Sequence, residues 1–436
     1  MGEGSNGDEA VMKHTVMHYV AVACGIMISV AAMQAQTPAG LTLDECQQRA
    51  AEHYPLTRQR ELLARSRDYS MDNVAKGYLP QVSISGQATY QSDVTQVPIS
   101  FPGINIDAPS RDQYKVYGEV SQTLYDGGTI SRQQRIQDVS TTAEERKIDV
   151  ELYKLRERIN QIFFGILLID EQRAQIAVLK QDLDAAIRKM KAAVANGTAL
   201  KSNVDVLEAE LLKTRQRDIE LGSARRTYAA MLGLLMDRPL DEKVVLVKPA
   251  SIQLSNGIDR PELRLYDAQR RIIDAQYDAI DARSMPRVGL FFQGGYGKPA
   301  LNMLKNSFEA YYVGGLRLTW SLTGLYSSGS ERELLDVNRA IVDVQQETFL
   351  FNTKLTLTQQ ETDMKKYAEL MQLDDDIIVL RASVKNTAEA QLEGGTITAN
   401  DYLREVHAED LARQDRLLHG MQLLMAQYGH QTTSGK

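Results

Sequence analysis

The sequence predicts an α+β membrane protein, in which an internally duplicated barrel of long α-helices is continuous with a four-strand share of a transmembrane β-barrel. The first observation is a repeat, because Pro55 and Pro80 lie 25 positions apart and so do Pro261 and Pro286. The second is that each proline-bounded helix is followed by strand-like alternation and then by a long helical stretch. Two copies of one plan in a chain of 436 residues predict pseudo-symmetric halves of a single architecture.

The predicted segments follow this duplicated order. They are an N-terminal extension and signal peptide that is removed (1–35), a first-repeat helix (36–79), a first β-hairpin (80–126), a first pair of long and short helices (127–235), an equatorial connector between the repeats (236–260), a second-repeat helix (261–285), a second β-hairpin (286–322), a second helix pair (323–430) and a disordered tail (431–436).

The N-terminal residues are typical of an exported protein. A positive start at Lys13 precedes an apolar run from Tyr19 to Met33, and Ala35 ends a cleavage-type segment. The acidic residues before Met12 have the wrong charge for the start of a signal, so Met12 is the predicted native start. The apolar run is shorter than the roughly 20 residues that a spanning helix needs, and no later segment reaches that length.

Cysteine content and charge exclude two further classes. Cleavage near Ala35 leaves Cys46 as the only mature cysteine, which excludes an intrachain disulfide, while lipidation of Cys24 inside the apolar run stays an alternative. The net charge of -7 argues against a nucleic-acid-binding surface.

The long helical stretches have the period of a coiled coil. In the first, apolar residues recur at alternating steps of four and three, at Ile148, Leu152, Leu155, Ile159, Ile162, Ile166, Ile169, Ile176, Leu183, Ile187, Met190 and Val194. The second copy repeats the pattern more weakly, at Leu334, Val337, Ile341, Val344, Phe351 and Leu355, with Thr348, Thr358 and Thr362 on the same stripe. The first pattern predicts a seam between helices, and the second predicts looser or partly wet packing.

Helix lengths predict a tall body. A helix over 128–196 is on the order of 100 Å long at 1.5 Å per residue. The stretches 44–79 and 200–234 together match that length, and 261–285 plus 399–429 match the helix over 325–393. Two short helices stacked end to end beside each long helix give a cylinder of antiparallel helices.

Four short segments alternate between apolar and polar residues, over 82–91, 114–124, 288–296 and 312–321. This alternation is typical of membrane β-strands, although a soluble sheet packed on a core shows it too. Aromatic residues near the segment ends favour the membrane, as a girdle of Tyr78, Tyr90, Tyr114, Tyr125, Tyr312 and Trp320. Four strands leave two open edges, which lipid cannot satisfy, so two or three chains must join to close a barrel.

Short motifs in a fixed order add a resemblance. They are the opening Leu41-Thr42-Leu43-Asp44-Glu45, the Leu79-Pro80 turn, the return from strand to helix over 122–128, and two Gly-Thr segments that each lead to Asp-x-Leu. In their order and duplication the chain resembles the TolC-like outer-membrane efflux protein family over nearly all of its mature length. The resemblance implies a homotrimer with a twelve-stranded barrel in the outer membrane of a Gram-negative bacterium and a periplasmic tunnel of twelve helices. It also implies an exit duct that works with a periplasmic adaptor protein and an inner-membrane transporter.

The resemblance places the adaptor-docking tips at the turns between long and short helices, at Asn196, Gly197, Thr198, Gly394, Gly395 and Thr396. A plain glycine stop between two helices would look the same. The second copy takes six steps from Gly395 to Asp401, whereas the first takes eight from Gly197 to Asp205, so the first docking turn departs from the pattern of the second.

A periplasmic constriction is implied about ten residues before the second turn, where some family members carry a ring of aspartates. Asn386 falls there in this chain, with Glu389 and Glu393 as the nearest acids. A glutamate ring facing a lumen could collect cations and favour opening by self-repulsion, but exposed helical glutamates are more often solvated. The run Asp374-Asp375-Asp376 is interpreted as a solvated charged face.

No catalytic constellation or cofactor motif is found, so the chain is not expected to be an enzyme. The histidines outside the signal show no metal-ligand grouping, and no phosphate-binding glycine loop is present. Three alternatives to an efflux exit channel stay open: the outer-membrane channel of a type I protein secretion system, an exported coiled-coil scaffold, and the periplasmic adaptor itself.

Overall fold

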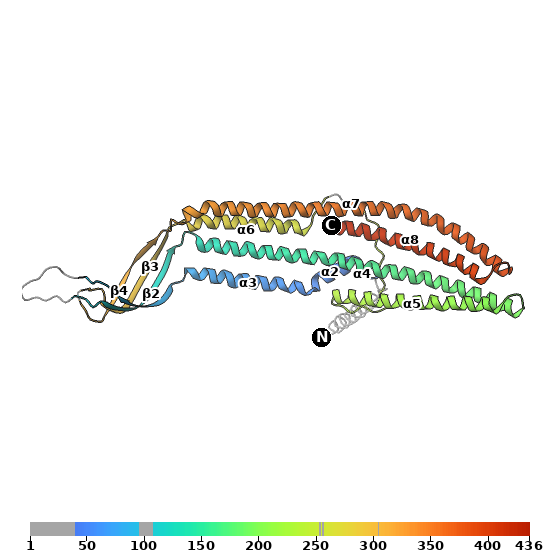
Figure 1. Cartoon of the computed structure of the whole chain (residues 1–436), viewed down its shortest axis with the longest axis horizontal. Helices are drawn as coiled ribbons and strands as arrows, with labels where there is room; N and C mark the ends of the chain where they lie inside the picture. Colours follow the sequence, from blue (N-terminus) through green and yellow to red (C-terminus); the bar gives the residue numbers. More distant parts are fainter. Residues whose placement is uncertain (1–39, 96–107, 253, 255–256, 304) are drawn as a thin grey trace, which may run out of the picture.

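The structure is a computed structural model that describes residues 40–95, 108–252, 254, 257–303 and 305–436. These residues form a long, narrow helical body with a small β-sheet at one end (Figure 1). Within these ranges, every helix is too short or too polar to cross a membrane. The predicted signal peptide, the start at Met12 and the alternative of a lipidated Cys24 lie outside the described residues.

The described residues contain seven α-helices, the first two of which occupy the segment predicted as one first-repeat helix. They are α2 (Leu43–His53), α3 (Arg58–Ala75), α4 (Thr129–Ala195), α5 (Lys201–Leu235), α6 (Pro261–Arg283), α7 (Gly324–Glu393) and α8 (Ala399–Ser434), with 3₁₀ turns at Pro55–Thr57 and Lys76–Tyr78.

Four columns of helix lie side by side in the body. The long helices α4, of 67 residues, and α7, of 70 residues, are single columns on the order of 100 Å long. The pairs α3 with α5 and α6 with α8 are stacked end to end, as the lengths predict (Figure 1). α4 contacts both stacked pairs, and α7 contacts α6 and α8. The column order is therefore α3/α5, α4, α6/α8, α7.

The sheet continues this order. Its antiparallel strands β1 (Gln81–Tyr90), β2 (Asp112–Tyr125), β3 (Arg287–Lys298) and β4 (Glu309–Thr319) are hydrogen-bonded in the order β1-β2-β3-β4. Each strand is joined to one column, because α3 leads into β1, β2 into α4, α6 into β3 and β4 into α7. The outer edges of β1 and β4 have no partner strand within the described residues.

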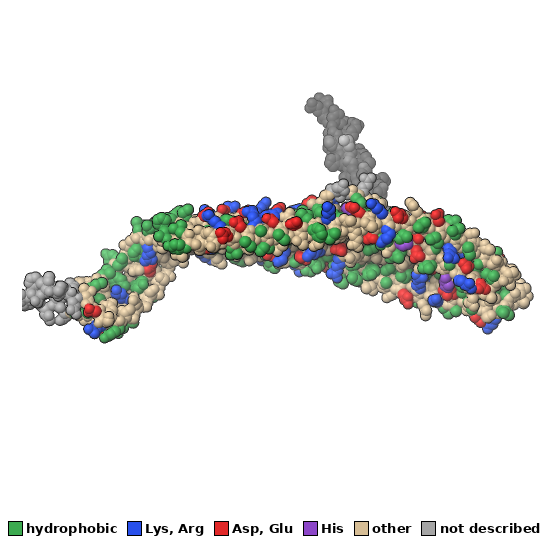
Figure 2. Space-filling view, turned by 45° about the horizontal axis from the view of Figure 1, so that its top comes forward, with side chains coloured by type: hydrophobic (Ala, Val, Ile, Leu, Met, Phe, Trp, Pro, Cys, Tyr) green, Lys and Arg blue, Asp and Glu red, His purple; other side chains and the backbone are tan. Residues whose placement is uncertain are grey.

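The two faces of the sheet differ in chemistry. One face presents apolar side chains to solvent, including Val82, Ile84, Leu316 and Leu318, and Ile84 is 83% exposed. The other face carries a polar cluster, in which Arg317 Nη1 lies 2.8 Å from Glu119 Oε1 and Gln293 also donates to Glu119. Figure 2 shows hydrophobic side chains gathered over the sheet and the adjoining end of the helical body. An ordinary soluble sheet would bury its apolar face.

Two large hydrophobic cores, and a smaller cluster of Ile273, Ile280 and Leu335 between α6 and α7, lie within the described part of the body. The first surrounds α2, whose Cys46 and Ala50 are fully buried near Phe163 and Phe164 of α4. This core fills the junction between α3 and α5, and Leu41 adds a bridge to the connector through hydrogen bonds with Val245 and Val247. The second core lies at the far end of the body, where α4, α5, α7 and α8 pack against one another.

The two heptad stripes differ in burial. Most of the stripe on α4 is buried, as the predicted seam requires. The stripe on α7 is exposed, because this helix is the last column and contacts other helices only on the side of α6 and α8. Its members Leu334, Val337, Ile341, Val344, Phe351 and Leu355 are each 50 to 62% exposed.

The prediction of a disordered tail from residue 431 is wrong. Helix α8 continues to Ser434, which is 2% exposed. The carbonyl oxygen of Ser434 accepts a hydrogen bond of 2.7 Å from the backbone N–H of Asp259, just before α6. The polar composition of this segment suggested a loose end, but its backbone closes the junction between α8 and α6.

Candidate functional site at the helix tips

The turns that end α4 and α7 have the same backbone structure. Gly197 and Gly395 adopt left-handed conformations, with φ of 73° and 72°. In each turn the following threonine donates its N–H five positions back, Thr198 to Ala193 and Thr396 to Gln391, at 2.9 Å. This is the Schellman pattern that satisfies the last carbonyl groups of a helix. A Cβ on either glycine would meet no atom within 4 Å, so both turns are open to a partner.

The two turns also have the same length, although the spacing from each glycine to the following aspartate differs. Leu200 and Thr398 are the N-cap residues of the following helices, each three positions after its left-handed glycine. Asp401 belongs to a capping box with Thr398, whereas Asp205 lies further inside α5. The unequal spacing arose because these two aspartates occupy different helical positions.

The remaining predicted tip residues flank these glycines. Asn196 and Gly394 are the C-cap residues of α4 and α7. A hydrogen bond of 3.4 Å from the Ala399 N–H to Asn203 Oδ1 joins the start of α8 to α5. The two helical hairpins therefore meet at their tips, and each presents one exposed turn (Figure 1).

An ion-paired cluster connects the hairpins just behind the turns. Lys189 of α4 places Nζ 2.8 Å from Glu389 Oε1 and 2.6 Å from Glu393 Oε1, both on α7. Hydrogen bonds to Glu389 and Glu393 raise the pKa of Lys189 above its ordinary value, so it stays charged. We call Lys189, Glu389 and Glu393 the tip latch. Its glutamates keep part of their surface in solvent, and one cation from the other hairpin neutralises part of their charge.

A cavity lies beside the tip latch. It has a volume of about 380 Å³ and lies between α4 and α7, with Ala186 and Met190 on one side, Leu392 on the other and Tyr402 of α8 at its base. Asn386, the third predicted constriction residue, shares a helical face with Glu389 and Glu393 but is exposed and outside the latch.

A second layer of charges lies deeper in the body. Lys385 of α7 bridges Asp182 of α4 at 3.2 Å and Glu409 of α8 at 2.7 Å. The neighbouring Asp410 is buried, and its Oδ1 has no hydrogen-bond partner in the described part of the chain. Burial raises the pKa of the Asp410 carboxyl above its ordinary value. The hairpins are thus joined by ion pairs at two levels.

The interpretation of Asp374 as part of a solvated run is wrong. Asp374 is 7% exposed, and its Oδ2 lies 2.7 Å from Nδ1 of His419 on α8. Asp375 forms an ion pair with Arg416, so two of the three aspartates face α8. A run of three aspartates suggested an exposed face, but α8 packs against this part of α7 and buries the Asp374 side chain beside His419.

The remaining predicted residues lie at the two ends of the sheet. Pro80 and Pro286 directly precede β1 and β3. The six predicted girdle residues are all exposed and form two rows, with Tyr78, Tyr125 and Trp320 near the helices and Tyr90, Tyr114 and Tyr312 at the far ends of the strands. Phe308, which the sequence did not single out, joins the far row by stacking on Tyr296 and Tyr114.

Comparisons with known proteins agree in fold. No protein-family model matches the sequence, and no curated protein matches it significantly. Among solved structures, the outer membrane protein VceC from Vibrio cholerae matches with a TM-score of 0.63 and 12% identity, over 90% of this chain and 96% of that chain. The CmeC outer membrane channel of Campylobacter jejuni matches with a TM-score of 0.62 and 12% identity, over 90% and 85%. The open state of the MtrE outer membrane channel of Neisseria gonorrhoeae matches with a TM-score of 0.62 and 14% identity, over 90% and 88%.

These structures and this chain share one architecture over nearly the full length of each. The chain therefore has the fold of the TolC-like outer-membrane channels, which confirms the resemblance. CmeC and MtrE are outer membrane channels, and VceC is an outer membrane protein.

Proposed function

We propose that the protein is a passive exit channel in the outer membrane of a Gram-negative bacterium. The observation that carries this proposal is the sheet, whose exposed apolar face lies between two rows of aromatic residues at the end of a long polar body. Lipid satisfies such a face, whereas water does not. The fold shared with solved outer-membrane channels supports the same conclusion.

The channel is a homotrimer. One copy leaves β1 and β4 with open edges and α7 with an exposed apolar stripe. Pairing β1 of one copy with β4 of the next satisfies the edges and places α7 beside the α3/α5 column of its neighbour. Three copies give twelve strands and a helical tunnel with its apolar stripes covered.

The tunnel serves as the exit duct of a tripartite efflux pump. A periplasmic adaptor protein docks on the exposed turns around Gly197 and Gly395, and an inner-membrane transporter supplies the energy. Docking separates the hairpins and breaks the tip latch, which opens the periplasmic end. The channel of a type I secretion system would also have an outer-membrane barrel and adaptor-docking turns. The crosslinking experiment that follows therefore decides which class of transporter the channel serves.

Cysteine crosslinking in the native host tests this function. Gly197→Cys and Gly395→Cys should each crosslink to an adaptor, because both positions are open and lie at the tip. Glu220→Cys, on an exposed face of α5 away from the tips, is the matched control and should give no adduct. Mass spectrometry of the adducts identifies the adaptor and, through its partner, the transporter class.

Two outcomes would overturn the proposal. A full set of tip cysteines without any adaptor adduct would remove adaptor docking. A chain that fractionates as a soluble periplasmic or secreted fibre, without detergent and without heat-modifiable migration on gels, would favour the coiled-coil scaffold instead.

A further inference from the structure

The polar face of the sheet contains a cavity close to the point where the strands join the helices. It has a volume of about 270 Å³ and is walled by β2, β3, β4 and the start of α4. This volume is smaller than that of pockets that hold whole drug-sized molecules. The cavity therefore suits a single chemical group of a larger solute.

The strand register places the polar side chains of the cavity on one face. Arg287 of β3 is opposite Thr319 of β4. Two positions further along β3, Gly289 lies between Thr123 of β2 and Arg317 of β4. Side chains two positions apart on a strand point to the same face, so both rows share the face of the cluster formed by Arg317. Because Gly289 has no side chain, the second row is hollow at its centre.

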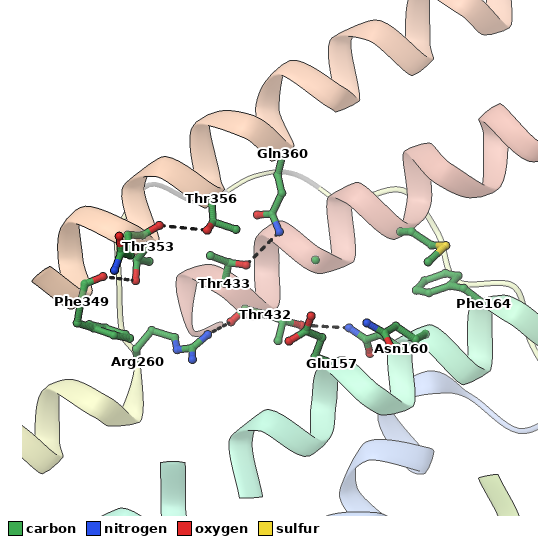
Figure 3. A pocket seen from close by; sticks show the side chains of 14 residues that line it. Glu157, Asn160, Phe164, Arg260, Phe349, Thr353, Thr356, Gln360, Thr432 and Thr433 are labelled. Atoms are coloured by element: carbon green, nitrogen blue, oxygen red, sulfur yellow. Dashed lines mark hydrogen bonds between the residues drawn. The ribbon is translucent and has the colours of Figure 1, made fainter. Parts of the chain in front are cut away.

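Arg287 presents an unpaired guanidinium to this cavity. Its side chain is exposed and forms no hydrogen bond or ion pair with any residue that the structure describes. A larger cavity of about 540 Å³, walled by α4, α7 and α8, also contains an arginine. That residue, Arg260, is not available to a ligand in the same way, because it already donates to Glu262 and to the carbonyl oxygen of Thr432 (Figure 3).

The other charged groups in and beside the wall of the small cavity are paired. Arg317 Nη1 lies 2.8 Å from Glu119 Oε1, so these two charges compensate each other. The carboxylate of Asp126 accepts hydrogen bonds from the backbone N–H groups of Gly128 and Ile130, at 2.9 and 2.7 Å. Asp126 therefore balances the positive end of α4. Arg287 is left as the uncompensated charge among the described residues of the wall.

Three hydroxyl groups add possible donors. The side chains of Ser121, Thr123 and Thr319 line the cavity and form no hydrogen bond within the described part of the chain. A hydroxyl rotates to donate or accept according to its ligand. Beside the guanidinium of Arg287, which only donates and matches the planar geometry of an oxyanion, these hydroxyls complete a donor-rich site.

We propose that this cavity is a lumenal binding site for an anionic group of a passing solute, namely a carboxylate, a sulfonate or a phosphate. Arg287 binds the oxyanion, and the three hydroxyls donate to its remaining oxygens. The inference deepens the proposed function, on which it rests for the position of the site, because an apolar face toward lipid leaves the polar face toward the lumen. It names Arg287 as a residue that selects solutes by charge at the base of the barrel.

Binding of pyranine, a fluorescent aromatic trisulfonate, tests the site on purified full-length protein in a non-ionic detergent. Fluorescence anisotropy should give a Kd that Arg287→Gln weakens about fivefold, the loss expected for one exposed charge pair. Arg287→Lys should weaken binding less, because it keeps the charge but not the planar fork. Arg215→Gln is the matched control, since it removes an exposed arginine without an ion pair from α5 and should leave the Kd unchanged.

Competition separates a soluble anion from a lipid headgroup, which offers the same phosphate chemistry. Sodium sulfate should displace pyranine from the wild type more than sodium chloride does at equal ionic strength. Phosphatidylglycerol in mixed micelles should displace it no better than phosphatidylcholine, because the site lies on the polar face. Preferential displacement by phosphatidylglycerol would overturn the lumenal position.

The site is refuted if Arg287→Gln binds pyranine like the wild type, or if Arg215→Gln weakens binding as much as Arg287→Gln. Light scattering of each variant in detergent checks that the assembly is retained. Since the binding assay needs neither transport nor an adaptor, a negative result would leave the proposed channel untouched.

Discussion

Replacing Lys189 with glutamine tests how the tip latch keeps the hairpins together. The substitution keeps the length and polarity of the side chain but removes the charge that bridges Glu389 and Glu393. It leaves two carboxylates one helical turn apart on α7 without a counter-charge. The loss of this attraction across the two helices favours separation of α4 and α7, whereas the repulsion between the two glutamates stays within α7.

The expected magnitude follows from exposure. The Lys189 side chain is 54% exposed and its partners are 36% and 50% exposed. Exposed pairs contribute about 0.2–1 kcal/mol each, so the two pairs together contribute about 1 kcal/mol per protomer. If three protomers open together, the sum of about 3 kcal/mol shifts the opening equilibrium on the order of 100-fold.

Planar-bilayer recording of the purified protein measures this shift as open probability. Lys189→Gln should raise it strongly, and Lys191→Gln is the matched control. Lys191 pairs with Glu208 at 2.7 Å inside the first hairpin, so its loss leaves the contact between hairpins intact. An unchanged open probability in Lys189→Gln, or an equal rise in both variants, would refute the latch.

Three further substitutions or modifications probe other parts of the chain. Gly395→Ala should lower the thermal midpoint by a cost of about 1–2 kcal/mol, because its φ is 72°, while Gly394→Ala at φ -77° should be nearly neutral; equal midpoints would contradict this. Burial raises the pKa of the Cys46 thiol to about 12, so iodoacetamide at pH 8 should leave the thiol unmodified until the protein unfolds. Mass spectrometry measures the alkylation, and rapid alkylation of the folded protein would contradict the prediction. Burial raises the pKa of Asp410 in the folded protein, so folding disfavours the ionised carboxylate. The free energy of unfolding should therefore fall as pH rises from the pKa of Asp410 in the unfolded chain to its raised value in the folded protein. Asp410→Asn should remove this fall in thermal melts, and an unchanged dependence of the thermal midpoint on pH would contradict the prediction.

The repeat and the helical period were sufficient to predict most of the fold. Proline spacing located both helix-to-strand turns, because proline ends helices and is tolerated before a strand. The heptad on α4 predicted its buried seam. The stripe on α7 is exposed in a single copy because α7 is the last column of the chain, which the sequence pattern alone does not indicate.

The candidate site was harder to predict, because its partners are far apart in sequence. Lys189 precedes Glu389 by 200 positions, and nothing local to either residue indicates the pair. The sequence therefore indicated Glu389 and Glu393 but not Lys189, the cation with which they pair. Asp374 was assigned to solvent for the same reason, since its partner His419 lies on the next helix.

Multi-angle light scattering of the purified mature protein in detergent tests the central claim most directly. We expect a single species of three copies that requires detergent to remain in solution, because each copy leaves two sheet edges and one apolar helical stripe uncovered. A well-folded monomer that stays dispersed in detergent-free buffer would contradict the channel.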